Sequence, residues 1–354
     1  MERLGQFSFR CVLTVVGFLL PMGIYTGIGW ANPYAAKLGE PAVKVRIGAC
    51  AVTGGFIHLY AALDNHLFEK YGIQAEPVVV RGGSVAMAGL ASDEISFLYC
   101  NADANIVRIG AGADGKLVAS PLVGLPYVIL ARKDIKGPLD LKGKRIGVTR
   151  PGDFPYRLAK EFLKKFNLSE KEVTLATVGG TPTERYTALV QDMFQATLIQ
   201  PPLDARGKKD GFNVIYNLND LGLPFIYSSL FTNSKTLNDR PAVVQKAVAA
   251  LAESVYFVEK NPEQGMAAVG RTLRLKDPDT LRSAYEAYAI NLINRRMIVP
   301  AQMVADTLDL ARQEGTVIRR KVNEIFDNRF VDNLAKSGFM KELWGGEVPG
   351  ERKK

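Results

Sequence analysis

One pattern recurs along this chain: a short apolar strand, a glycine-rich turn and a helix. Val43–Ala49 alternates apolar with polar or small residues, which predicts a strand, and it leads into Thr53–Gly54–Gly55. Apolar residues at helical spacing then run from Ile57 to Phe68. Strand, turn and helix in succession are typical of a parallel sheet with helices on both faces. The sequence therefore predicts an α/β fold.

The pattern occurs in two series, and the second begins after Leu139–Lys142. Gly82–Asn101 and Gly179–Pro202 share one plan, in which a glycine pair and a small hydroxyl residue precede a helix, an acidic turn and a strand. A chain of 354 residues has room for two domains of about 150 residues. We therefore expect two similar, doubly wound lobes. The further predicted strands are Val78–Val80, Ile95–Tyr99, Leu117–Pro121, Arg145–Thr149, Val173–Val178, Thr197–Ile199 and Val214–Tyr216.

From about Pro241 the sequence becomes helical and amphipathic. Val243–Lys260 and Val299–Gly315 each predict a helix, the second opened by Pro300. We expect these C-terminal helices to pack on lobe one.

The N-terminus has the pattern of a signal peptide. Arg3 and Arg10 precede an apolar run from Cys11 to Trp30, and cleavage is expected after Ala31. An uncleaved membrane anchor is the alternative, and we expect no later segment to be long and apolar enough to span a bilayer. The rest of the chain is therefore expected outside the cytoplasmic membrane, in the periplasm.

Composition and motifs argue against several classes of function. The net charge is +9, but the basic residues are scattered, so we expect no nucleic-acid partner. His58 and His66 are eight residues apart without acidic partners at metal-binding spacing, so no metal site is expected. Gly110–Gly115 matches a dinucleotide motif but follows a helix, which indicates a helix end and a turn. We expect no cofactor and no catalytic residues.

Cys50 and Cys100 end the first and third predicted strands of lobe one. Neighbouring strands would bring the thiols near each other, and a disulfide is chemically possible outside the cytoplasm. Parallel neighbours seldom offer suitable Cβ geometry, so two buried free thiols are the favoured expectation.

Ligands of such sheets bind at the carboxyl ends of the strands, where helix N-termini carry unpaired N–H groups. One helix end stabilises an anion by only about 0.3–1 kcal/mol, so several loops from both lobes must converge. The glycines could instead make tight turns, the aromatic residues could belong to the core, and Arg150 could pair with Asp153. The candidate ligand-binding residues are Thr53, Gly54, Gly55, Phe56, Gly83, Ser84, Cys100, Asn101, Arg150, Gly152, Asp153, Phe154, Thr181, Gln200, Pro201 and Tyr227.

In several runs the chain resembles periplasmic substrate-binding proteins of ABC importers, in the group that handles nitrate, sulfonates, taurine and thiamine-pyrimidine precursors. The runs that carry the resemblance are Val45–Ile73, Val78–Asn101, Gly137–Asp153, Val173–Asp204 and Gly211–Gly222, with KNPE at 260–263 and DNRFVDNL at 327–334. Together they cover about Val43 to Leu334, and their order and spacing are more specific than any one motif.

The resemblance implies a type II periplasmic-binding-protein fold. Residues 1–31 would be the signal peptide, 42–126 and 233–354 lobe one, and 127–232 lobe two with the hinge crossings. The crossings themselves are expected near Tyr127–Lys133 and Tyr227–Thr232. The partners implied are a small-molecule ligand, an ABC permease and its ATPase subunit, with the chain itself a monomer.

The chain departs from this family in the loop Asp153–Phe154–Pro155, where sulfonate binders typically have small hydroxyl residues. We expect Asp153 to repel an anion and Phe154 to stack on a ring, which favours an aromatic or zwitterionic ligand. Tyr99–Ala104 also stands where the family often has a glycine–proline pair. The cysteine-rich motif of the related pyrimidine synthases is absent, which disfavours an enzyme. A protein that presents its closed lobes to a membrane sensor is the alternative to an importer receptor.

Overall fold

The computed structural model describes residues 31–80, 82–178, 181–223 and 225–350. Of the segment predicted as a signal peptide, all but Ala31 lies outside these residues, as does the predicted glycine pair Gly179–Gly180. The unit that begins at Asn32 contains every helix and strand given below.

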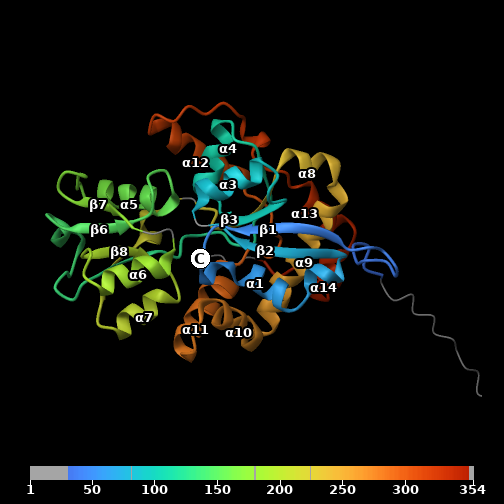
Figure 1. The fold of residues 1–354 in the computed structure, drawn as a ribbon, viewed down its shortest axis with the longest axis horizontal. Coiled ribbons are helices and arrows are strands. Elements are labelled where there is room, and N and C mark those ends of the chain that lie inside the picture. The colour runs from blue at the N-terminus through green and yellow to red at the C-terminus, as the bar shows by residue number, and fades with distance from the viewer. Residues whose placement is uncertain (1–30, 81, 179–180, 224, 351–354) are drawn as a thin grey trace, which may run out of the picture. The chain divides into compact units, whose positions relative to one another are not determined.

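Two five-stranded sheets organise this unit, and we call the parts built on them lobe one and lobe two (Figure 1). The lobe-one sheet has the order β2-β1-β3-β10-β4, with β10 antiparallel to β3 and β4. Its strands are β1 Val43–Ala49, β2 Ile73–Val79, β3 Phe97–Asn101, β4 Lys116–Ala119 and β10 Ser228–Thr232.

The lobe-two sheet repeats this order as β7-β6-β8-β5-β9, with β5 antiparallel to β8 and β9. Its strands are β5 Val128–Ala131, β6 Arg145–Val148, β7 Thr174–Thr177, β8 Ala196–Ile199 and β9 Asn213–Asn217. In each sheet the antiparallel strand is the one that the chain enters on arriving from the other lobe. The prediction of two similar, doubly wound lobes is therefore confirmed.

The chain passes between the lobes twice, and the two connections pair with each other. Val123 bridges Ile226, and the amides of Gly124 and Tyr227 donate to the carbonyls of Phe225 and Leu122. The ranges expected to form the crossings, Tyr127–Lys133 and Tyr227–Thr232, instead contain β5 and β10. The apolar residues of these two ranges form β5 and β10, and the connections between the lobes lie just before these strands.

Helices cover both faces of each sheet (Figure 1). In lobe two, α5 lies on one face and α6 and α7 on the other. The helices of the first two-thirds of the chain are α1 Ile57–Asp64, α2 Leu67–Lys70, α3 Gly83–Ala91, α4 Asp103–Ala111, α5 Phe154–Lys165, α6 Pro182–Val190 and α7 Leu203–Lys209. Those after β10 are α8 Ser234–Asp239, α9 Pro241–Lys260, α10 Pro262–Leu273, α11 Pro278–Tyr285, α12 Ala301–Gln313, α13 Arg329–Lys336 and α14 Phe339–Trp344.

The long helix α9 is the centre of the C-terminal packing that the sequence predicted. It contacts α1, α2 and α13, while α12 contacts α4. By length and composition α9 also qualifies as a membrane span, contrary to the expectation that no later segment would. Val244, Val248 and Val255 on this helix are fully buried in the lobe-one core. This burial is typical of a core helix, which passes the same length and hydropathy test.

Two local features differ from the sequence prediction. The helix expected from Ile57 to Phe68 is divided into α1 and α2 because His66 adopts a left-handed conformation with φ 53°. Strand β2 begins at Ile73, five residues before the predicted Val78. It lies at the sheet edge and contains Pro77, a residue that edge strands tolerate, so the apolar alternation there is weak.

Candidate functional site

A small cavity of about 50 Å³ lies between the two lobes, where strands of both sheets end. Lobe one contributes Thr53 after β1, Gly83 after β2 and Asn101 at the end of β3. Lobe two contributes Thr149 after β6 and Gln200 after β8. A cavity of this kind at the carboxyl ends of strands is the expected ligand position in doubly wound sheets. The prediction that loops of both lobes converge therefore agrees with the geometry.

Arg185 on α6 is the notable charge in this cavity wall. The side chain is 1% exposed, and only Nη2 has a partner, the carbonyl of Leu198 at 3.4 Å. Nε and Nη1 are buried without a hydrogen-bond partner. Burial lowers the pKa of Arg185, yet a guanidinium stays protonated in proteins. The site thus holds a desolvated positive charge with two free donors.

Two further buried polar atoms of the wall have no hydrogen-bond partner. They are the hydroxyl oxygen of Thr149 and Oε1 of Gln200. Leaving such groups unpaired costs about 1–3 kcal/mol each, and native proteins rarely do so without a functional reason. These atoms and Arg185 together can bind a small polar ligand that has an anionic group.

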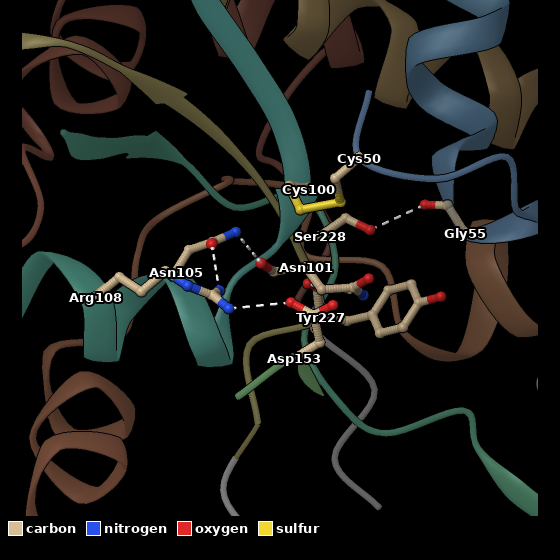
Figure 2. The surroundings of a disulfide bond; sticks show 9 residues. All are labelled: Cys50, Gly55, Cys100, Asn101, Asn105, Arg108, Asp153, Tyr227 and Ser228. Atoms are coloured by element: carbon tan, nitrogen blue, oxygen red, sulfur yellow. Dashed lines mark hydrogen bonds and ion pairs between the residues drawn. A yellow bond between two sulfur atoms is a disulfide. The ribbon is translucent and has the colours of Figure 1, made fainter. Parts of the chain in front are cut away.

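An ion pair joins the lobes at one side of the cavity (Figure 2). Arg108 on α4 donates through Nη2 to Asp153 Oδ1 at 3.0 Å and to the Gly152 carbonyl at 2.9 Å. Asn105 orients the guanidinium by accepting from Nη1 at 3.0 Å. Because Arg108 offsets Asp153, the positive charge of Arg185 remains in excess among the lining residues.

The structure corrects the expectations about the side chains of the loop after β6. Arg150 is exposed and does not line the cavity, and Asp153 pairs with Arg108 rather than with Arg150. Asp153 therefore does not present an unpaired charge that repels an anion. Phe154 lines the cavity, but its ring stacks on Phe225 with centroids 4.2 Å apart, so that face is not free for a ligand ring.

Cys50 and Cys100 form a disulfide in the cavity wall (Figure 2). The expectation of two free thiols is therefore wrong. The last registered pair of β1 and β3 is Ala49 with Tyr99, and Cys50 lies one residue beyond it, in a bend. Because Cys50 lies outside the regular strand pair, its Cα–Cβ bond can point toward Cys100, which regular parallel pairing would not allow.

Further contacts join the two lobes at and beside the cavity wall. Gln200 donates to the Thr53 hydroxyl at 2.7 Å, and the Tyr288 hydroxyl donates to the Pro201 carbonyl at 2.8 Å. A Cβ on Gly54 would lie 2.9 Å from that same carbonyl oxygen. Gly54 thus allows the backbones of the two lobes to approach, which a larger residue would prevent.

Seven of the sixteen predicted residues line the cavity and nine do not. Those in the wall are Thr53, Gly83, Cys100, Asn101, Asp153, Phe154 and Gln200. Those outside it are Gly54, Gly55, Phe56, Ser84, Arg150, Gly152, Thr181, Pro201 and Tyr227.

The structure gives several of the excluded residues another role. Phe56 and Tyr227 are fully buried aromatic residues of the core, and a Cβ on Gly55 would lie 2.2 Å from the Tyr227 ring. Thr181 is the N-cap of α6, where its hydroxyl accepts from the Glu184 amide in a capping box. Gly152 contributes its carbonyl to Arg108. These residues therefore belong to the core, to a helix cap and to the hydrogen bonds of Arg108, rather than to the cavity wall.

The sequence prediction missed three polar residues that helices bring to the cavity, namely Asn105, Arg108 and Arg185. Arg185 had a detectable signal, because it lies three residues after Pro182 and three and four before Ala188 and Leu189. All of these are buried, so a charged residue occurs on the apolar face of a short helix. Tyr127 and Thr149 carried no comparable signal.

Among the residues that the structure describes, no group of three or more His, Cys, Asp or Glu side chains could hold a metal ion. His58 is fully buried in α1, and His66 is exposed at the start of α2.

Comparisons with known proteins agree with this architecture. A binding protein of Brucella abortus is 26% identical over 238 residues, which cover 66% of this chain and 72% of that protein. The alkanesulfonate-binding protein SsuA of Xanthomonas axonopodis pv. citri, solved with MOPS, matches with a TM-score of 0.68 at 19% identity, over 81% of this chain and 99% of that one. The periplasmic nitrate-binding protein NrtA of Synechocystis PCC 6803 matches with a TM-score of 0.67 at 11% identity, over 88% and 92%.

These solved structures share the periplasmic-binding-protein fold, which the two sheets of identical strand order also display. The family described as NMT1/THI5 like matches residues 54–265, more than half of the chain and both sides of the cavity. The chain therefore belongs to the NMT1/THI5 like family.

Proposed function

We propose that this protein is a periplasmic solute-binding protein that closes its lobes around a small organic anion and delivers it to an ABC-type importer. The observation that carries the proposal is Arg185, a buried guanidinium with two unpartnered donors in the cavity between the lobes. The names of the two solved relatives, which bind an alkanesulfonate and nitrate, support an anionic ligand.

The chemistry of the wall supports one negative charge on the ligand. Arg108 and Asp153 offset each other, which leaves Arg185 as the excess charge. Nε and Nη1 lie on different edges of the guanidinium, so an anion such as a carboxylate or sulfonate would accept a charge-assisted hydrogen bond from one of these two donors. The free Oε1 of Gln200 would accept a hydrogen bond from a hydroxyl or amino group on the same molecule.

Export and delivery are the remaining parts of the proposal. The basic and apolar N-terminal segment supports export, and the periplasmic relatives support the same compartment. In a strain that lacks this protein, uptake of the ligand found by a thermal-shift screen is expected to fall to the background rate. Uptake should return when the wild-type gene is restored. Uptake that is unchanged would contradict the importer role even if the ligand binds.

The test of binding is a thermal-shift screen of the purified protein against alkanesulfonates, nitrate, carboxylates, amino acids, pyrimidines and aromatic acids. A ligand at one hundred times its dissociation constant is expected to stabilise the protein by about 2.7 kcal/mol. Arg185→Met should abolish that shift. Because the guanidinium has little to compensate its desolvation, the same variant should unfold at an equal or higher temperature without ligand.

The matched control is Arg206→Met on the next helix, an exposed arginine that stacks on Tyr186 and pairs with Asp210 away from the cavity. This variant should bind the ligand as the wild type does. An Arg185→Met protein that is stable and still binds would refute the anion site.

A further inference from the structure

Two hollows meet at the ring of Phe154. The first is the cavity of about 50 Å³ described above, and the second is a groove of about 470 Å³ between α5, α12 and the two connections of the lobes. Among the described lining residues, Phe154 is the one that belongs to both. Its neighbours Asp153 and Pro155 line the cavity alone, and Leu158, one turn along α5, lines the groove alone.

The Phe154 ring is held in place by both lobes and by the connections. It stacks on Phe225 with centroids 4.2 Å apart and packs edge-on against Tyr127 at 5.4 Å. The residue before it, Asp153, is fixed by its ion pair with Arg108. With 7% of its surface exposed, the side chain has little freedom to move aside while the lobes are closed.

The two hollows differ in chemistry. The cavity has the unpaired charge of Arg185, whereas the groove has an apolar floor that includes Leu125 and Phe225. Five carboxylates also line the groove, and Arg157 is the single basic residue among its described lining residues. The carboxylates belong to Asp103, Glu161, Asp306, Asp309 and Glu314. An anionic group therefore belongs in the cavity, and an apolar or cationic chain suits the groove.

We propose that Phe154 sets the maximum length of the ligand by separating the anion cavity from the groove. This inference rests on the proposed function. With Phe154 present, a ligand bound to Arg185 can extend only as far as the phenyl ring. Removal of the ring would join the two hollows and let a longer chain pass from the cavity into the groove.

The experiment measures the dissociation constants of unbranched alkanesulfonates and alkanecarboxylates of increasing length for the wild type and for Phe154→Ala. The wild type should bind short members and lose affinity once the chain reaches the ring. In Phe154→Ala the loss should move to longer chains, with a gain of about fourfold for each methylene that enters the new apolar space. Chains that end in an ammonium group should gain more than those that end in a methyl group, because the groove is acidic.

Two variants control for general damage. Phe166→Ala removes a half-buried ring at the end of the same helix, where it packs on Phe162 and Tyr216 rather than on either hollow, and it should keep the wild-type length limit. Phe154→Leu keeps a smaller apolar side chain and should show an intermediate limit, which tests the proposal if Phe154→Ala does not fold.

The outcomes separate this inference from the proposed function. If the wild type binds short anions through Arg185 and the length limit is the same in both Phe154 variants, the inference is wrong and the function stands. If the wild type binds no anion of any length, both are wrong.

Discussion

Arg185 and His58 are both buried polar side chains with unpartnered nitrogens, but they lie in different surroundings. Arg185 lines the cavity between the lobes, where the proposed ligand would pair with its free donors. His58 is fully buried in α1, and Ser254 donates to its backbone carbonyl at 2.6 Å. Desolvation lowers the pKa of His58 from 6.5 to about 3, which keeps the imidazole neutral in the folded protein.

His58 should make the protein less stable in mild acid. Below pH 6.5 the unfolded chain binds a proton at this residue, whereas the folded protein does not until about pH 3. The unfolded state is therefore favoured as the pH falls, and this group alone should remove about 2 kcal/mol from the free energy of unfolding between pH 7 and pH 5. Urea denaturation at both pH values measures the effect.

His58→Leu should remove this part of the pH dependence. His66→Asn should not, because His66 is exposed in a left-handed conformation that asparagine tolerates. Equal slopes for the wild type and His58→Leu would show that the buried imidazole is protonated in the fold.

Elements that are defined by local patterns were predicted well. The strand β1, the turn at Gly112 after α4, the capped helix α6 and the long helix α9 all occur where periodicity or turn chemistry indicated. The predictions of β2 and of a single helix through α1 and α2 were less accurate. The edge strand β2 has weak apolar alternation, and the left-handed turn that separates α1 from α2 is made by His66 rather than by a glycine that would have indicated it. The capping role of Thr181 was also missed, although Thr181 and Glu184 have the spacing of a capping box.

At the level of elements, the Cys50–Cys100 disulfide ties the ends of β1 and β3 together across a sequence separation of 50. Closing a loop of this length in the unfolded chain is expected to stabilise the fold by about 4 kcal/mol. The double variant Cys50→Ala/Cys100→Ala should therefore lose about that much free energy of unfolding in urea titrations.

Reductant should lower the urea midpoint of the wild type and leave that of the double variant unchanged. Two thiols that react in the denatured protein before any reduction would contradict the disulfide.

In the whole molecule, a second buried ion pair holds the lobes together beside the one made by Arg108. Arg157 on α5 of lobe two donates to Asp103 at the start of α4 at 2.7 Å and to Glu314 after α12 at 3.5 Å. Burial raises the pKa of Asp103, with Arg157 opposing that change. Removing one partner of such a pair costs about 3–5 kcal/mol, unless the remaining charge regains water.

Arg157→Ala should therefore favour the open arrangement of the lobes, because separation of the lobes returns Asp103 to solvent. Small-angle X-ray scattering without ligand should show a larger radius of gyration than for the wild type. Arg206→Ala, which removes an exposed pair at the C-terminal end of α7, is the control and should leave the radius unchanged. A lower melting temperature with an unchanged radius would mean that Arg157 stabilises the fold without controlling closure.

The sequence by itself determined the α/β class, the two similar lobes and the strand ends that line the cavity. These follow from periodicity and turn residues, which are local properties of the chain. The tertiary structure decided which distant side chains meet: Arg108 with Asp153, Cys50 with Cys100, and Phe154 with Phe225. It also left two donor atoms of Arg185, Nε and Nη1, without a hydrogen-bond partner. Such pairings depend on sheet register and on how two lobes pack, because segments far apart in sequence come together only when the fold is complete.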